Sequence, residues 1–403
     1  MHFKFTMVLV ITVLFSFFSC KDSLKDDLQP FQTLNDSVKK VYAPDKRVAI
    51  YDISLSSQGD QIKITGETDQ EEALKTFIEL IESKGKKVEN LATILPDSSV
   101  GQWQQAIVNN SVANIRSKAK HSGELATQAI LGTALKVLKI DGDFYLVQTP
   151  DGYISWVDHG GVTLLSSAQY MAWKKSPKVI FTKNFGFVYT QMGNELDKIG
   201  DIVLGSQLLL LEEKGDYYKV QYPDKREGYL KKYESEKYET WIKEVQGSGS
   251  LVELYAKELM GAPYLWGGTS SKGMDCSGFT KTVYLMNGYV IPRDASQQIN
   301  AGKDVDPTLK IENLEKGDLM FFGRKATDST NQRVTHVAIW LGNGQGEFIH
   351  SAGRVKMSSI DKNSIFYDDF NTNRYLGSRR YLGEKDELLI DMKLADHRTE
   401  IKS

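Results

Sequence analysis

The chain has 403 residues, of which 41% are hydrophobic and 25% charged, and its formal net charge is -2. Single hydrophobic cores stop growing at about 250–300 residues, so several domains are expected. The composition excludes a largely disordered chain. The near-neutral charge, without runs of Lys and Arg among aromatic residues, argues against a nucleic-acid partner.

The N-terminus has the features of an export signal. Lys4 is followed by an apolar run over 7–18 and by a serine before Cys20, one of two cysteines in the chain. This pattern is typical of a secretory signal peptide, predicted over 1–19.

Phe17-Phe-Ser-Cys resembles a bacterial lipobox, with Phe17 in place of the usual Leu. The resemblance implies acylation of Cys20 and a protein exported and lipid-anchored to a bacterial membrane, on its periplasmic side. A plain secretory signal or a short membrane anchor is the alternative.

Residues 20–40 are predicted to form a polar tether and residues 41–102 a small α+β domain. Two strand candidates, over 47–53 and 61–65, precede a helical stretch over 70–84, in which apolar residues recur at helical spacing. The region has no pattern of catalytic residues. A domain that serves for packing is therefore expected.

Short strand-like segments separated by turn signals follow, over 103–168 and again over 175–243. In the first region, Asn114-Ile-Arg, Glu124 and Gly152-Tyr-Ile-Ser-Trp resemble the bacterial SH3-like barrel of cell-wall enzymes. The second region is a weaker repeat that lacks two of these segments, so it is expected to pack and space its neighbours.

Cys276 lies between a glycine-rich loop and a helix candidate over 278–286. A cysteine at a helix N-terminus is stabilised as the thiolate, which predicts a pKa below the ordinary value of about 8.5. The alternative is a small buried hydrophobe, which is what free cysteines usually are. The neighbouring Asp275 and Ser277 argue against a purely apolar site.

A nucleophilic cysteine needs a base, and two histidines have suitable positions. His336 opens the strand-like segment His-Val-Ala-Ile-Trp-Leu-Gly, and His350 closes the next one. The turn Gly342-Asn-Gly-Gln-Gly predicts a hairpin that brings them together. We expect His336 to be the general base and His350 to orient it. His397 lies in a charged tail, predicted over 386–403, without such a setting.

The segments Asp-Cys-Ser-Gly-Phe, Gly-Asp-Leu-Met-Phe-Phe, Thr-His-Val-Ala-Ile and Ile-His-Ser-Ala resemble the NlpC-type cysteine peptidases. The resemblance implies a papain-like domain over 250–385 with a Cys276, His336 and His350 triad, and no metal or other cofactor. The backbone N–H of Cys276 and the hydroxyl of Tyr264 are candidates for stabilising the oxyanion. The expected fold class is α+β multidomain: a small N-terminal domain, two SH3-like β-barrels and the peptidase domain.

This arrangement resembles γ-D-glutamyl-L-diamino acid endopeptidases. The resemblance implies that Glu124 and Tyr153 hold a free N-terminal amine together with Asp275, and that Ser277 and Ser296 contact the substrate beside them. The expected reaction is hydrolysis of the bond from γ-D-Glu to meso-diaminopimelate or L-Lys. The substrates are peptidoglycan-derived peptides with a free N-terminal L-Ala, in cell-wall turnover or recycling.

Two other functions are open at this point. One is an endopeptidase that acts on intact peptidoglycan, with the barrels as wall-binding modules. The other is a wall-binding scaffold with an inert peptidase domain, against which the presence of Cys276, His336 and His350 argues.

Overall fold

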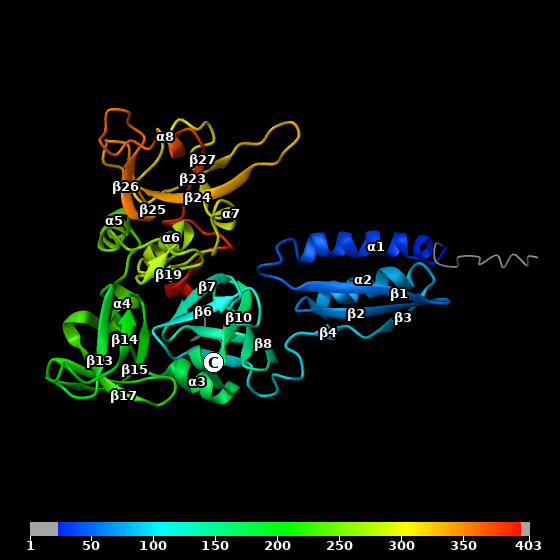
Figure 1. Ribbon diagram of the computed structural model, residues 1–403, viewed down its shortest axis with the longest axis horizontal. Helices are drawn as coiled ribbons and strands as arrows, with labels where there is room; N and C mark the ends of the chain where they lie inside the picture. Colours follow the sequence, from blue (N-terminus) through cyan, green and yellow to red (C-terminus); the bar gives the residue numbers. More distant parts are fainter. Residues whose placement is uncertain (1–22, 396–403) are drawn as a thin grey trace, which may run out of the picture. The chain divides into compact units, whose positions relative to one another are not determined.

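The computed structural model describes residues 23–395, which form two compact units, one ending at Ile94 and one starting at Leu95 (Figure 1). The signal peptide predicted over 1–19 and the lipidation predicted at Cys20 lie outside the described residues. Within residues 23–395, none of the helices has the length and apolar character needed to cross a membrane.

The N-terminal unit packs two helices on a four-stranded sheet in which β2 pairs with β1 antiparallel and with β3 and β4 parallel. Its elements are α1 (Ser23–Tyr42), β1 (Tyr51–Gln58), β2 (Gln61–Thr68), α2 (Glu71–Glu82), β3 (Lys87–Asn90) and β4 (Thr93–Ile94). The core forms where the apolar stripe of α2, with Phe77 and Ile81, meets Ile62 and Ile64 of β2. These side chains are spaced for one face of a helix and one face of a strand.

Helix α1 corrects the N-terminal prediction. The polar tether expected over 20–40 is wrong for residues 23–40, which are helical. Phe31 and Val38, two helical turns apart, are 6% and 5% exposed in the core of the N-terminal unit. A narrow apolar stripe in a polar segment therefore suffices to dock this helix. The domain predicted over 41–102 starts too late, and it also ends too late, because Val100 is buried in the next core.

Two β-domains of seven antiparallel strands each follow. The first contains β5 (Gln105–Val108), β6 (Val112–Arg116), β7 (Leu125–Ile130), β8 (Ala134–Asp141), β9 (Phe144–Gln148), β10 (Ile154–Asp158) and β11 (Val162–Leu165), and α3 (Ser167–Lys175) follows it. The second contains β12 (Lys178–Phe181), β13 (Phe185–Tyr189), β14 (Lys198–Val203), β15 (Gln207–Lys214), β16 (Tyr217–Gln221), β17 (Glu227–Lys231) and β18 (Ser235–Lys237), and α4 (Tyr238–Glu244) follows it. Numbered from its own first strand, each sheet has the order 7-1-4-5-6-2-3.

The C-terminal domain is built on a six-stranded antiparallel sheet of order β22-β27-β23-β24-β25-β26. Its strands are β22 (Lys303–Asp304), β23 (Leu319–Arg324), β24 (Arg333–Trp340), β25 (Glu347–Ala352), β26 (Arg354–Ser359) and β27 (Tyr375–Arg380), and its helices are α5 (Gly249–Glu258), α6 (Cys276–Leu285), α7 (Ala295–Gln298) and α8 (Asp369–Thr372). The short hairpin β19 (Thr269–Ser270) and β20 (Gly273–Met274) precedes α6. Helix α6 packs against β24 and β25, so its N-terminus lies beside the strands that carry the two histidines.

The end of the chain also differs from the prediction. Residues 386–395 of the expected charged tail belong to the C-terminal domain, because β28 (Ile390–Asp391) pairs with β21 (Tyr289–Val290). Leu389 is 8% exposed within the core of that domain. His397 and the residues from 396 onward lie outside the described part of the chain.

Candidate active site

Cys276 is the first residue of α6, as its sequence context predicted. Asp275 caps this helix, because its carboxylate accepts a hydrogen bond of 2.7 Å from the Gly278 N–H. The N–H of a first helical residue has no partner within the helix and can donate to an oxyanion. The thiol is 7% exposed and forms a hydrogen bond with the backbone of Val337, the residue after His336. The predicted nucleophile therefore lies beside β24, the strand that carries His336.

The predicted hairpin of β24 and β25 is confirmed, with Ile339 opposite Ile349. It places His336 Nε2 2.7 Å from His350 Nδ1, and His350 Nε2 lies 3.0 Å from the hydroxyl of Ser358. If His350 donates its Nε2–H to Ser358, its Nδ1 must accept from His336. His336 then carries its proton on Nε2, which leaves Nδ1 free to take the proton of the thiol.

The pKa predicted for the nucleophile has the wrong direction. Burial raises the pKa of the Cys276 thiol to about 12, and the charge of Asp275 adds to this effect. Burial also lowers the pKa of His336 to about 4. The helix terminus is outweighed because a charged sulfur is costly in a site closed to water. Thiol and imidazole are therefore both neutral near pH 7.

These pKa values predict how activity depends on pH. The acid limb of kcat/KM should fall near pH 4, where His336 gains a proton, and not near 6.5, because burial disfavours the imidazolium. A rate profile from pH 3 to 8 measures this limb. Unfolding must be followed in parallel. Both histidines have lowered pKa values, so their stabilising contribution is present above about pH 6.5 and is lost as the pH falls through about 4 for His336 and about 3 for His350. A limb near 6.5 in the folded protein would contradict the neutral pair.

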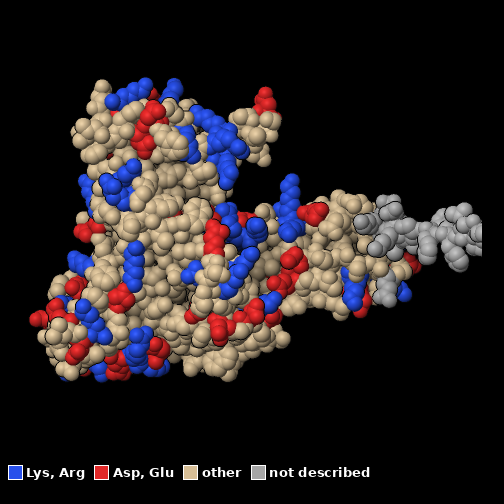
Figure 2. Space-filling model, in the orientation of Figure 1, with Lys and Arg blue, Asp and Glu red and all other residues tan. Residues whose placement is uncertain are grey.

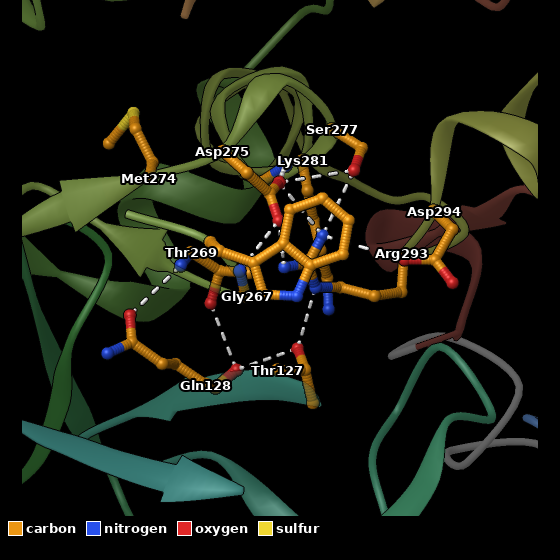
Figure 3. Close-up of polar contacts among 12 residues, drawn as sticks. Thr127, Gln128, Gly267, Thr269, Met274, Asp275, Ser277, Lys281, Arg293 and Asp294 are labelled. Atoms are coloured by element: carbon orange, nitrogen blue, oxygen red, sulfur yellow. Dashed lines mark hydrogen bonds and ion pairs between the residues drawn. The ribbon is translucent and has the colours of Figure 1, made fainter. Parts of the chain in front are cut away.

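A buried ion pair holds the start of α6. Arg293 is 1% exposed and donates to both oxygens of Asp275, at 3.0 and 2.7 Å, and to the hydroxyl of Ser277, at 3.0 Å. Its Nε donates to the hydroxyl of Thr127 at 2.9 Å, so this side chain links the first β-domain to the residue before the nucleophile (Figure 3). The sequence predicted no role for Arg293, because no local pattern links it to Asp275 or Thr127.

Asp275 and Ser277 are thus both engaged within the protein. The carboxylate of Asp275 also accepts the Gly267 N–H at 3.0 Å, and its charge is balanced by Arg293. The predicted contacts of both residues with substrate remain predictions. Ser296 is half-buried on α7, which packs against β24. Burial raises the pKa of Tyr264, a neighbour of Cys276, to about 12, so its hydroxyl keeps its proton and can donate to an oxyanion.

The first β-domain borders this site closely. Glu124, the residue before β7, accepts a hydrogen bond of 2.8 Å from the indole N–H of Trp266. Gly267 has a positive φ of 78°, and a Cβ there would lie 2.3 Å from the carbonyl oxygen of Leu125. Only glycine permits so close an approach of the two backbones. Tyr153 is 9% exposed, and its charge interaction with Arg293 places it near the same ion pair.

Thr269, in β19, adds two hydrogen bonds between the C-terminal domain and the first β-domain. Its N–H and hydroxyl each form a 3.0 Å hydrogen bond with Gln128, the first with the side chain and the second with the backbone carbonyl. Lys281 of α6 adds a 2.8 Å ion pair with Asp151, whose carboxylate is 1% exposed. The contact between Gln128 and Thr269 spans 141 positions of sequence, so it follows only from the fold.

A buried thiol at a helix start, next to a strand whose histidine is hydrogen-bonded to a second histidine, is the arrangement expected of a cysteine peptidase. Residues 261–374 match the NlpC/P60 family, and residues 115–161 match the bacterial dipeptidyl-peptidase SH3 domain. The chain belongs to the NlpC/P60 family. The predicted resemblance is thereby confirmed.

Similar proteins match about two thirds of this chain. The γ-D-glutamyl-L-lysine dipeptidyl-peptidase of Bacillus cereus is 32% identical over 271 residues, which cover 65% of this chain and 77% of the relative. Dipeptidyl-peptidase 6 of Lysinibacillus sphaericus is 27% identical over 271 residues, 65% of this chain and 94% of that one. The crystal structure of an NlpC/P60 family protein from Bacillus cereus superimposes with a TM-score of 0.59 at 27% identity, over 69% of this chain and 99% of that one.

Proposed function

We propose that this peptidase hydrolyses the bond from γ-D-glutamate to an L-diamino acid in short peptidoglycan-derived peptides with a free N-terminal L-Ala. Cys276 attacks the γ-carbonyl while its proton passes to His336 Nδ1. The resulting imidazolium gives that proton to the leaving amine, and a thioester on Cys276 remains. Water then hydrolyses the thioester with His336 as the base. The names of the similar peptidases support this substrate class.

One observation carries the requirement for a free amine. Glu124 accepts from the neutral indole of Trp266, and it forms no ion pair with a Lys or Arg within residues 23–395. Asp275, in contrast, is neutralised by Arg293. Glu124 is therefore a negative charge without an ion-pair partner beside the site. Its hydrogen-bond partner Trp266 precedes Gly267, whose N–H donates to Asp275. A substrate ammonium is the group that such a carboxylate would bind.

Removing this charge tests the proposal. The Glu124→Gln variant keeps an acceptor for the Trp266 N–H but loses the negative charge. It should lower kcat/KM for the free tripeptide L-Ala-γ-D-Glu-diaminopimelate by roughly 10- to 100-fold, the usual effect of a charge-assisted hydrogen bond. The slow cleavage of the N-acetylated tripeptide should not change. Coupled liquid chromatography and mass spectrometry measure both rates.

Asp141→Asn is the matched control, because Asp141 is an exposed carboxylate at the end of β8 in the same domain. It should leave both rates unchanged. Equal rates of Glu124→Gln and the wild type on the free tripeptide would remove the amine contact from the proposal.

Three further features belong to this proposal. The identical strand order of the two β-domains supports two SH3-like barrels. The second barrel then acts as a spacer, and Lys272 of the C-terminal domain forms an ion pair with its Asp201. The lipobox-like segment at Cys20 supports anchoring of the exported enzyme to a membrane.

A further inference from the structure

A cavity of about 420 Å³ lies against His336, the proposed catalytic base. Its lining includes His336 and His350 together with the basic side chains of Lys356 and Arg374. Because His336 delivers its proton to the leaving amine, the leaving residue must lie next to His336 while the bond breaks. This cavity is therefore positioned for the part of the substrate that departs first.

The charges in the cavity do not cancel. Within residues 23–395, no ion pair of 4.0 Å or less joins Lys356 or Arg374 to a carboxylate, although the charge of Lys356 acts on Asp368, which also lies 3.9 Å from His350. Asp368, the acidic group in the lining, has its carboxylate engaged by Asn371, whose backbone N–H and side-chain amide donate at 3.0 and 2.7 Å. Two cations thus face one carboxylate that already caps α8. Figure 2 shows Lys and Arg side chains gathered on this domain near the hairpin of β23 and β24.

Arg374 is also held in place. One of its guanidinium nitrogens donates to the hydroxyl of Thr335, and the guanidinium carbon lies 4.3 Å from the centre of the Phe370 ring. A guanidinium has five N–H donors, so most of them stay available in a fixed plane. Lys356 lies directly opposite His350 in the pairing of β25 and β26, so its side chain is on the same face of the sheet.

We propose that Lys356 and Arg374 form a binding site for a carboxylate of the leaving diamino acid. This inference rests on the proposed function and adds a determinant for the leaving side of the scissile bond. The two ends of the binding site are then oppositely charged, with Glu124 for the ammonium of the first residue and Lys356 with Arg374 for a carboxylate of the last. Such a pair of ends suits a free tripeptide and disfavours a peptide that is extended or crosslinked at its last residue.

The carboxylate has two possible sources, the α-carboxylate of the diamino acid and the distal carboxylate of diaminopimelate. Four substrates separate them: L-Ala-γ-D-Glu-meso-diaminopimelate and its three forms with one carboxylate amidated, at D-Glu, at the α-position or at the distal position. For the wild type, amidation of the bound carboxylate of the leaving residue should lower kcat/KM roughly 10- to 100-fold. In Lys356→Gln/Arg374→Gln the same amidation should change kcat/KM less than threefold.

Two controls distinguish a loss of rate caused by a disturbed His336 from a loss caused by weaker binding of the carboxylate. L-Ala-γ-D-Glu p-nitroanilide has a leaving group without a carboxylate, so the double variant should lose more on the tripeptide than on the anilide. Lys362→Gln removes an exposed lysine outside the cavity lining and should match the wild type on every substrate.

The inference is overturned if the wild type is indifferent to amidation at both positions of the leaving residue. It is also overturned if the double variant loses the same factor on all four peptides and on the anilide. A wild type that cleaves the anilide and tripeptide but ignores these amidations leaves the proposed function standing without this site. A wild type inactive on every substrate removes the proposed function, and the carboxylate site with it.

Discussion

Replacing Cys276 by Ala should lower the rate of peptide hydrolysis on the order of 10⁵-fold, because no other group can form the thioester. Within residues 23–395 it is the sole cysteine, and its thiol forms a hydrogen bond with the backbone of Val337, the residue that follows His336. Stability should change little, since the substitution removes one sulfur atom from a closed site. Initial rates on the free tripeptide, with thermal unfolding of the same samples, measure both effects.

Cys276→Ser is the matched control for this result. The serine keeps an acceptor and donor at the start of α6, but its hydroxyl is a far weaker nucleophile than sulfur. It should remain impaired by several orders of magnitude while folding like the wild type. An alanine variant within tenfold of wild-type activity would show that the reaction does not pass through Cys276.

Replacing Arg293 by Met should destabilise the unit that starts at Leu95 by roughly 3–5 kcal/mol, because the carboxylate of Asp275 is left buried without its cation. Arg293 is 1% exposed and makes four hydrogen bonds to three residues, so little water can take its place. Activity at low temperature should fall as well, since Asp275 caps the helix that begins with the nucleophile. Urea unfolding followed by tryptophan fluorescence measures the loss.

Two variants separate the buried charge from the loss of volume. Arg293→Met/Asp275→Asn should recover part of the stability, because Asn still caps a helix and carries no charge to bury. Arg379→Met removes a half-buried arginine whose pair with Asp304 is 3.8 Å long, and it should cost less than about 1 kcal/mol. A loss below about 1 kcal/mol for Arg293→Met would show that the buried pair does not hold this region.

The placement of the three candidate catalytic residues on a helix start and two paired strands was predictable, because it depends on local sequence signals. A glycine-rich loop before a helix places Cys276 at its start, and the turn after β24 determines that the strands of His336 and His350 pair. The strand-rich regions were visible from short runs of β-branched residues between turns. The family resemblance followed from motif order, which a sequence displays directly.

The predictions that failed concern properties that depend on burial and on contacts between residues far apart in the sequence. The pKa of Cys276 follows from exclusion of water, which local sequence does not report, and burial reversed the direction expected from the helix terminus. Arg293 meets Thr127 across 166 positions of sequence, so no local pattern marks the pair. Helix α1 was missed because its sequence is mostly polar. Its few apolar residues, such as Phe31 and Val38, are recognisable as core residues only once the helix is seen packed in the N-terminal unit.

The most direct test of the amine-gated peptidase compares three substrates with the same enzyme preparation. These are free L-Ala-γ-D-Glu-meso-diaminopimelate, its N-acetylated form and intact sacculi, with Cys276→Ala as the blank and mass spectrometry as the readout. We predict that the wild type releases L-Ala-γ-D-Glu from the free tripeptide and leaves the other two essentially uncut. Comparable cleavage of all three would contradict the account and identify an endopeptidase of intact peptidoglycan.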